Sequence, residues 1–199
     1  MRHGRRTTLL AIIGIVTKPQ NVVAIEKATG RAWDSWVAWL TAAGARNKGH
    51  AEIAALIQHE LQDKTDSPGW WAQGIAVAYE QHTGRRMPGQ RGDGSFEMSV
   101  SRTLDGTREQ MSKRYFKKLT VAHDFDGQKP TNKRTSTTPV RSYWRCKLVK
   151  NSNVTWSFEQ KAANKVLLTI NHANIHSSDE AVRWRAFWKQ YLDDITSND

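Results

Sequence analysis

Apolar residues recur at helical spacing through the N-terminal part of the chain, from residue 21 to residue 84. Trp33, Trp36, Val37 and Leu40 show the i, i+3, i+4, i+7 pattern of a helix with one buried face. Similar stripes begin near residues 21, 50 and 67, and the residues expected to cap these helices are Asn21, Gly30, Gly44, Ser67 and Gly84. The pattern predicts a four-helix module over residues 21–90.

The pattern changes at residues 85–94, "RRMPGQRGDG", which hold three Gly, one Pro and three Arg. Such a stretch is typical of a loop. Apolar and polar residues then alternate over 96–100, which predicts a strand. Helical spacing returns as far as residue 119, with Asp105 as the expected cap. Residues 120–140 are polar and weakly patterned, and we expect a long loop there with one strand at most.

Three further segments alternate strictly, and a strongly patterned helix follows them. The apolar positions of these segments are Trp144, Cys146 and Leu148, then Val154, Trp156 and Phe158, then Val166, Leu168, Ile170 and His172. This predicts an antiparallel meander with one buried face. Ser177 and Glu180 have the spacing of a capping box, and an apolar stripe predicts a helix to about residue 195. The expected fold class is α+β, with a shortened sheet domain over residues 91–199 packed on the long C-terminal helix.

The order of strand, helix, antiparallel strands and long C-terminal helix resembles the START-like (birch-pollen-allergen-like) superfamily. The segment "NHANIHSSDEAVRWRAFWKQYL" is similar to the ending of bacterial relatives of the activators of heat-shock-chaperone ATPases. There a strand carrying His precedes a polar turn and a helix of the type W-x3-W-x3-L, positions that His172, Trp184, Trp188 and Leu192 occupy here. The resemblance implies a helix-grip domain, in which a curved sheet holds the last helix and encloses a cavity. Because few residues separate 119 from 140, it implies an abbreviated grip.

Residues 22–90 resemble an uncharacterised small helical domain of bacterial proteins that is often fused to START-like domains. The resemblance rests on "ATGRAWDSW", "GHAEIAALI" and "GWWAQGIAVAYEQHTGRR". It implies that the last of these is the domain's signature helix. The helical spacing predicts a buried stripe along this helix that begins at Trp71 and continues with Ile75, Ala78, Tyr79 and His82.

Residues 1–20 imitate a signal peptide, because three arginines in the first six residues precede an apolar run over 9–16. No small-x-small cleavage pattern follows, and the run is too short to span a bilayer. We therefore expect an extended or disordered leader and a cytoplasmic protein without a transmembrane segment. The single cysteine, Cys146, also favours a reducing compartment.

The motifs of common enzymes, G-x-S-x-G, H-E-x-x-H, a Walker loop and a strand-linked G-x-G-x-x-G, do not occur. The sequence therefore leans against an enzyme, and we expect no cofactor. His172 and His176, with His123, Asp124 and Asp126, are residue types that bind metals. Their spacing is unspecific, and His172 continues the apolar face of its strand. A hydrogen-bonded core histidine is the better interpretation, and we predict no metal site.

The first functional hypothesis is a non-enzymatic binding protein that holds a small apolar ligand in a reduced grip cavity. Apolar walls with one or two polar groups are typical of such pockets. The residues expected to line this pocket are Trp144, Trp156, Phe158, His172, Trp184 and Trp188. The alternative is that these side chains simply fill the core.

The second hypothesis is binding of nucleic acid or another polyanion. The net charge is +11, and residues 102–150 supply +9 of it, with 13 Lys or Arg against 4 Asp or Glu. Cations mixed with aromatic and hydroxyl side chains suit phosphate contacts and base stacking. The candidate residues are Lys113, Arg114, Lys117, Lys118, Lys133, Arg134, Arg141 and Arg145. One alternative is that the basic surface is merely solvated, and the same interpretation applies to Arg85 and Arg86 at the end of the fourth helix. Another alternative is a scaffold or protein-partner role without a ligand.

Overall fold

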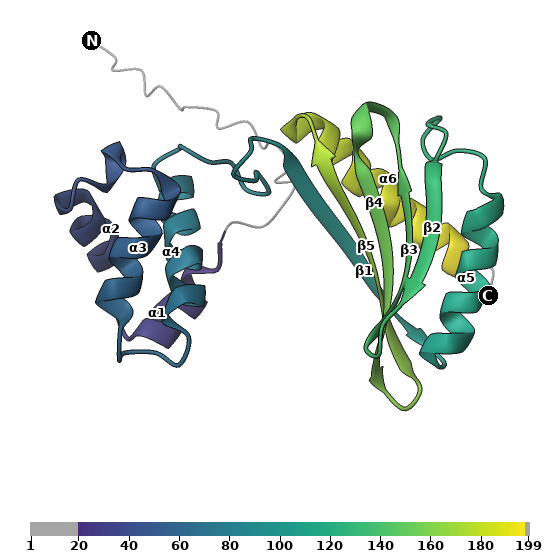
Figure 1. Ribbon diagram of the computed structural model, residues 1–199, viewed down its shortest axis with the longest axis horizontal. Helices are drawn as coiled ribbons and strands as arrows, with labels where there is room; N and C mark the ends of the chain where they lie inside the picture. The colour runs from purple at the N-terminus through teal and green to yellow at the C-terminus, as the bar shows by residue number, and fades with distance from the viewer. Residues whose placement is uncertain (1–19, 198–199) are drawn as a thin grey trace, which may run out of the picture.

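A computed structural model describes residues 20–197 of the chain. Within that range the buried apolar residues fall into two separate clusters, one among the N-terminal helices and one between the sheet and its helices. Figure 1 shows the two parts joined by the segment that follows residue 82. None of the helices in the described range is long and apolar enough to cross a membrane.

The N-terminal part consists of four α-helices and one short 3-10 helix. They are α1 (Val22–Thr29), α2 (Trp33–Ala42), η1 (Ala45–Asn47), α3 (His50–Leu61) and α4 (Pro68–His82). Asn21 caps α1 as expected, because its side-chain oxygen accepts a hydrogen bond from the Ala24 N–H at 3.1 Å. Ser67 holds the N-cap position of α4 without a capping hydrogen bond from its side chain. His82, expected in the buried stripe of α4, is exposed and makes an edge contact with Trp33.

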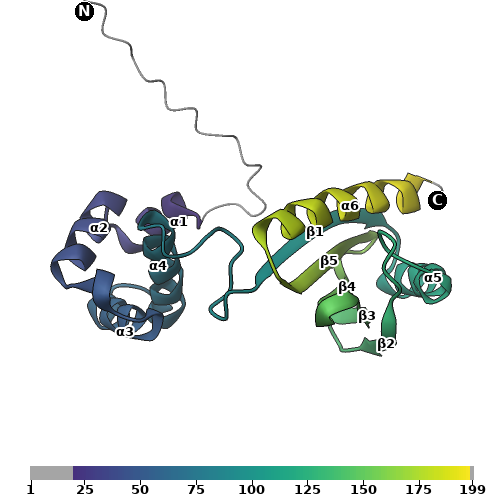
Figure 2. The same ribbon diagram turned by 90° about the horizontal axis from the view of Figure 1, so that it is seen from above.

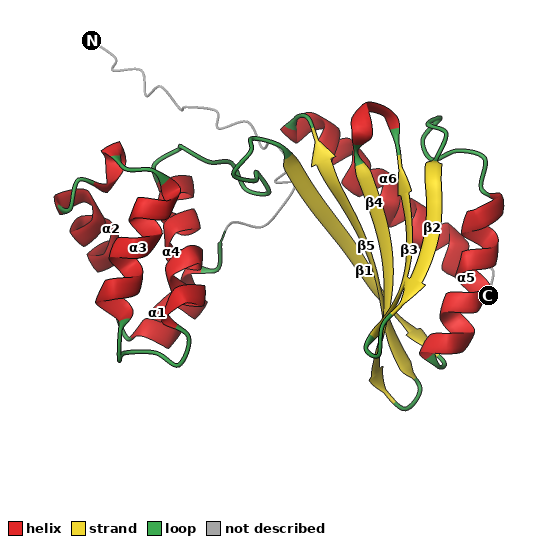
Figure 3. Ribbon diagram, in the orientation of Figure 1, coloured by secondary structure: helices red, strands yellow, loops and turns green. Residues whose placement is uncertain are grey.

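The remaining described residues form an antiparallel sheet and two long helices (Figure 3). In chain order these elements are β1 (Phe96–Asp105), α5 (Arg108–Val121), β2 (Thr131–Thr137), β3 (Arg141–Lys147), the 3-10 turn η2 (Val149–Asn151), β4 (Asn153–Ala162), β5 (Lys165–Ile175) and α6 (Ser178–Ser197). The strand order is β1-β5-β4-β3-β2, and every neighbouring pair is antiparallel. The predicted α+β class, with an antiparallel sheet packed on a long C-terminal helix, is confirmed.

Both long helices cover the same face of the sheet (Figure 2). Trp156 on β4 contacts Tyr115 of α5 and Trp188 of α6, so the two helices share one buried layer. The opposite face has no helix on it within the described residues. Along β4 the buried positions alternate with Thr155 and Ser157, which are partly exposed. The period-2 pattern therefore separates an apolar inner face from a polar face that is open to solvent.

The expected cap of α5 was wrong by two residues. Asp105 is the last residue of β1, where it lies opposite Lys165. Gly106, with a φ of 129°, then makes the turn that frees Thr107 to act as N-cap. The Thr107 hydroxyl accepts from the Gln110 N–H, and the Gln110 side chain accepts from the Thr107 N–H.

Candidate functional site

The six residues expected to line an apolar pocket all lie in one buried cluster on the inner face of the sheet. Trp188 is at its centre, with ring centroids 6.2 Å from Trp156, 6.1 Å from His172 and 5.8 Å from Trp184. Trp144 and Phe158 join the same cluster from β3 and β4. These side chains contact one another or adjacent rings of α5, α6 and Phe125, which lies between α5 and β2, as closely packed core residues do.

His172 is the polar group of this cluster. The indole N–H of Trp188 donates to His172 Nδ1 at 3.1 Å, so Nδ1 is the unprotonated nitrogen of the ring. Burial lowers the pKa of His172 to about 4, which keeps the imidazole neutral near pH 7. Among the described residues, His172 Nε2 and Trp156 Nε1 have no hydrogen-bond partner. The histidine therefore acts as a core acceptor for Trp188, as the strand pattern predicted.

The thiol of Cys146 lies in the same cluster, and burial raises its pKa to about 12. It is therefore protonated at neutral pH and unreactive as a nucleophile. Across the residues that the structure describes, no group of three or more His, Cys, Asp or Glu side chains is arranged to hold a metal ion.

The eight basic candidates are distributed over both faces of the sheet domain. Lys113, Arg114, Lys117 and Lys118 belong to α5, which packs on the inner face. Lys118 donates to the Ile195 carbonyl at 3.2 Å, so it connects α5 to α6. Their helix places these four cations away from the open face of the sheet.

Two further candidates have local structural roles. Lys133 donates to the carbonyls of Thr120 and Ala122 at 2.9 and 2.8 Å, at the C-terminal end of α5. A cation there complements the negative end of the helix dipole. Arg141 forms an ion pair with Glu159 at 2.7 Å across the β3–β4 pair. Hydrogen bonding to Glu159, and then to Tyr143, raises the pKa of Arg141.

The remaining two candidates, Arg134 and Arg145, lie on the open face and border a hollow of about 310 Å³. Lys147, which the sequence analysis did not select, is the third cation of this hollow. The complete lining is Asn132, Arg134, Arg145, Cys146, Lys147, Asn153, Val154 and Thr155. We call this site the basic hollow. Its lining holds three cations and no acidic side chain, with amide and hydroxyl groups beside them.

The register of β2 against β3 creates the basic hollow. Arg134 and Arg145 are direct cross-strand partners, although like charges directly opposite each other destabilise a sheet. A bulge between Thr131 and Arg134, with Asn132 at a φ of 50°, turns this end of β2. Bulges of this kind re-aim side chains and are frequent beside binding sites. The local arrangement thus gathers positive charge at an energetic cost to the sheet.

Arg145 has two further contacts on the open face. One guanidinium nitrogen donates to the Ser136 hydroxyl at 2.7 Å. The guanidinium carbon lies 4.2 Å from the ring centroid of Tyr143, which is within cation–π distance. Arg145 is therefore held in place at the edge of the hollow, whereas Arg134 opposite it is exposed.

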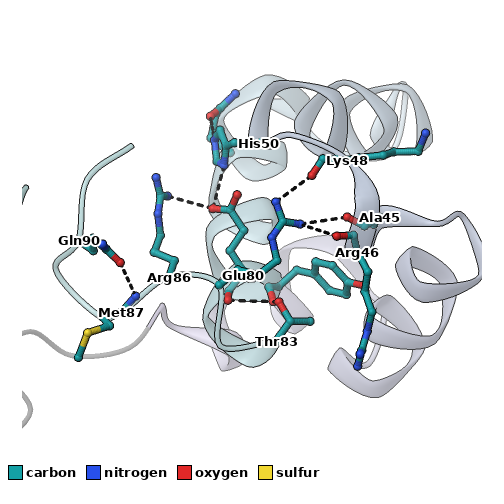
Figure 4. A network of polar contacts seen from close by, with 12 residues as sticks. Ala45, Arg46, Lys48, His50, Glu80, Thr83, Arg86, Met87 and Gln90 are labelled. Atoms are coloured by element: carbon teal, nitrogen blue, oxygen red, sulfur yellow. Dashed lines mark hydrogen bonds and ion pairs between the residues drawn. The ribbon is translucent and has the colours of Figure 1, made fainter. Parts of the chain in front are cut away.

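A second polar cluster lies in the helical part, at the end of α4 (Figure 4). The Glu80 carboxylate is 8% exposed and lies 3.3 Å from Arg86 and 3.1 Å from His50 Nδ1. Arg85 donates to the carbonyls of Ala45 and Lys48 at 3.1 and 2.8 Å. The arginine pair of "HTGRR" thus connects the start of the linker to α4 and η1, and Glu80 extends the network to His50 of α3, which is a structural role.

Arg86→Ala is expected to lower the free energy of unfolding of the helical part by about 1–3 kcal/mol, because it leaves a buried carboxylate with one partner fewer. Arg91→Ala is the matched control. Its ion pair with Glu97 is much more exposed, so the loss should stay below about 1 kcal/mol. Urea unfolding followed by circular dichroism would measure both. Equal losses for the two variants would contradict a structural role for Arg86.

Comparisons with protein-family models, with curated proteins and with solved structures found no match. The fold and the basic hollow define the class of this chain as an α+β protein with a one-sided antiparallel sheet and a cationic open face. Its function is therefore inferred from the geometry of that face.

Proposed function

We propose that the protein is a non-enzymatic binding protein for polyanions, nucleic acid foremost, and that it binds them in the basic hollow. The observation that supports this most directly is the cross-strand pair Arg134 and Arg145, joined by Lys147 in a lining without an acidic side chain. Two like charges held opposite each other destabilise the sheet, and a bound anion would relieve that repulsion. Phosphate groups are the anions that such Arg and Lys clusters bind best.

The chemistry of the lining favours binding over catalysis. Asn132, Asn153 and Thr155 supply amide and hydroxyl donors, which hydrogen-bond phosphate oxygens in nucleic-acid complexes. Cys146 is the one thiol in the chain, and its pKa of about 12 keeps it protonated at neutral pH. The hollow therefore offers charge and hydrogen-bond donors to an anion.

The apolar-ligand hypothesis has weaker support from the geometry. Its six residues lie together in the core, where Trp188 contacts Trp156, His172 and Trp184 directly. A ligand there would have to replace ring contacts that already stabilise the domain. The basic hollow is open to solvent and needs no such rearrangement, so we favour the polyanion proposal.

Nucleic-acid affinity is expected to fall steeply as the salt concentration rises. Arg134→Ala and Lys147→Ala should each weaken binding and make the slope of log K against log salt shallower by about 0.7–0.9, since each removes one phosphate contact. Fluorescence anisotropy with a labelled oligonucleotide at several salt concentrations would measure both quantities. Lys133 is unsuitable for this test, because its amine is bonded to carbonyls at the end of α5.

Lys27→Ala provides the control for net charge. Lys27 is exposed in the last turn of α1, in the helical part of the chain, and its loss changes the total charge by the same amount. If polyanions bind in the basic hollow, the slope of log K against log salt for Lys27→Ala should be close to that of the unaltered protein. Equal effects of Lys27→Ala, Arg134→Ala and Lys147→Ala would show non-specific attraction to a basic protein and would contradict a site in the basic hollow.

A further inference from the structure

The open face beside the basic hollow carries one aromatic side chain in a position to stack. Tyr143 on β3 is partly exposed, and the Arg145 guanidinium lies 4.2 Å from its ring centroid. Arg145 also borders the hollow, so cation and aromatic ring form a continuous surface with the proposed phosphate site. We call Tyr143 and Arg145 the stacking platform.

The neighbours of Tyr143 differ along its own strand and across the strands. Along β3 the Tyr143 side chain lies between Arg145, which covers its ring, and Arg141, which hydrogen-bonds to it. The residues opposite Tyr143 across the strands are Ser136 on β2 and Ser157 on β4, both small and polar. Neither side chain is large enough to cover an aromatic ring. A flat group the size of a nucleobase that approaches the platform across the strands therefore meets no large side chain at these two positions.

Two rows of residues extend from the platform across the whole sheet. The strand registers place them side by side as Arg134, Arg145, Thr155, Asn171 and Ser99, and as Ser136, Tyr143, Ser157, Thr169 and Ser101. All ten are polar, and none is acidic. With strands about 4.8 Å apart, five strands give each row a length of about 19 Å. The first row begins at Arg134 and Arg145, and toward its far end Asn171 donates to the Glu97 carboxylate at 2.6 Å.

We infer that the polyanion bound here is single-stranded nucleic acid, with one base stacked on Tyr143 and Arg145 and the adjacent phosphate in the basic hollow. The inference rests on the proposed function and names its ligand class. Aromatic rings and Arg guanidinium planes stack on bases only where the bases are unpaired and splayed out. A duplex keeps its base faces covered and could engage the hollow through phosphates alone.

Tyr143→Ala tests this inference, with Tyr143→Phe as the matched control. The probes are a labelled single strand of mixed sequence, in RNA and DNA forms, the corresponding duplex, an abasic single strand and heparin. Tyr143→Ala should weaken binding of the intact single strand by about 5- to 150-fold, the range found for the loss of one stacked base. Tyr143→Phe should retain binding, because the ring remains. Abasic strand and heparin should bind equally to all three proteins.

The outcomes separate this inference from the proposed function. If Arg134→Ala weakens binding of every polyanion but Tyr143→Ala weakens none, the hollow binds phosphates and the single-strand inference is wrong. Equal affinity for single strand, abasic strand and duplex would also overturn it. If the unaltered protein binds none of the probes, both proposals fail. Circular dichroism and melting of Tyr143→Ala and Tyr143→Phe would exclude loss of fold as the cause of any difference.

Discussion

Trp188→Ala is expected to lower the free energy of unfolding of the sheet domain by about 3–5 kcal/mol. Trp188 is fully buried, and among the described residues its ring contacts six others: Phe125, Trp156, His172, Trp184, Phe187 and Tyr191. Alanine would leave a large cavity between α6 and the sheet. It would also remove the donor that hydrogen-bonds His172 Nδ1.

The single cysteine offers a measurement that reports on the sheet domain alone. Cys146 is buried in the same cluster as Trp188, so its labelling by a thiol reagent in increasing urea follows the unfolding of this domain. Trp70→Ala is the matched control, because Trp70 lies on α4 and is 66% exposed. Trp188→Ala should shift the labelling midpoint to much lower urea, and Trp70→Ala should leave it in place. A loss below about 1 kcal/mol for Trp188→Ala would show that α6 packs peripherally.

Acidification from pH 7.5 to pH 4 is expected to destabilise the sheet domain by an amount on the order of 3 kcal/mol through His172. In the unfolded chain this imidazole takes up a proton as the pH falls through about 6.5. In the folded domain burial lowers its pKa to about 4, so it stays neutral over most of that range. The unfolded state therefore binds more protons between these two values. The stability that neutral His172 provides is complete above pH 6.5 and is lost as the pH falls toward 4.

His172→Gln isolates this contribution, because a glutamine oxygen can still accept from the Trp188 N–H but does not titrate. Urea unfolding at a series of pH values should show that the unaltered protein loses stability more steeply than the variant between pH 6.5 and 4. His59→Gln, an exposed position on α3, should follow the unaltered protein. Parallel curves for the unaltered protein and His172→Gln would refute the prediction.

The strands of the meander could be predicted from the sequence, because apolar residues on their buried face alternate with polar residues on the other face. Trp156 and Phe158 alternate with Thr155 and Ser157, and the structure buries the first pair alone. The same alternation on β3 places Tyr143, Arg145 and Lys147 on the open face, so the signal for Lys147 was present in the sequence. The density of cations along the chain, by contrast, does not distinguish Lys147 from its basic neighbours.

The basic hollow itself could not be predicted, because it depends on β2. Every residue of β2 is exposed, so "TNKRTST" has no apolar alternation to mark a strand. It is an edge strand held by backbone pairing with β3. Lys133 and Arg134 are adjacent in sequence, yet one reaches the end of α5 and the other borders the hollow. The resemblance to START-like proteins stays a prediction, as do the bound ligand and the cytoplasmic location.

The pairing of β1 with β5 bears on how the chain folds. Phe96 lies opposite Ile175, so the sheet closes between segments at opposite ends of its domain. Loop closure over that distance carries an entropic penalty before any contact compensates for it, and non-local pairing slows folding. The helical part has its contacts close together in sequence and is synthesised first. We therefore expect it to fold early, while β1 remains an unpaired strand until β5 has been made.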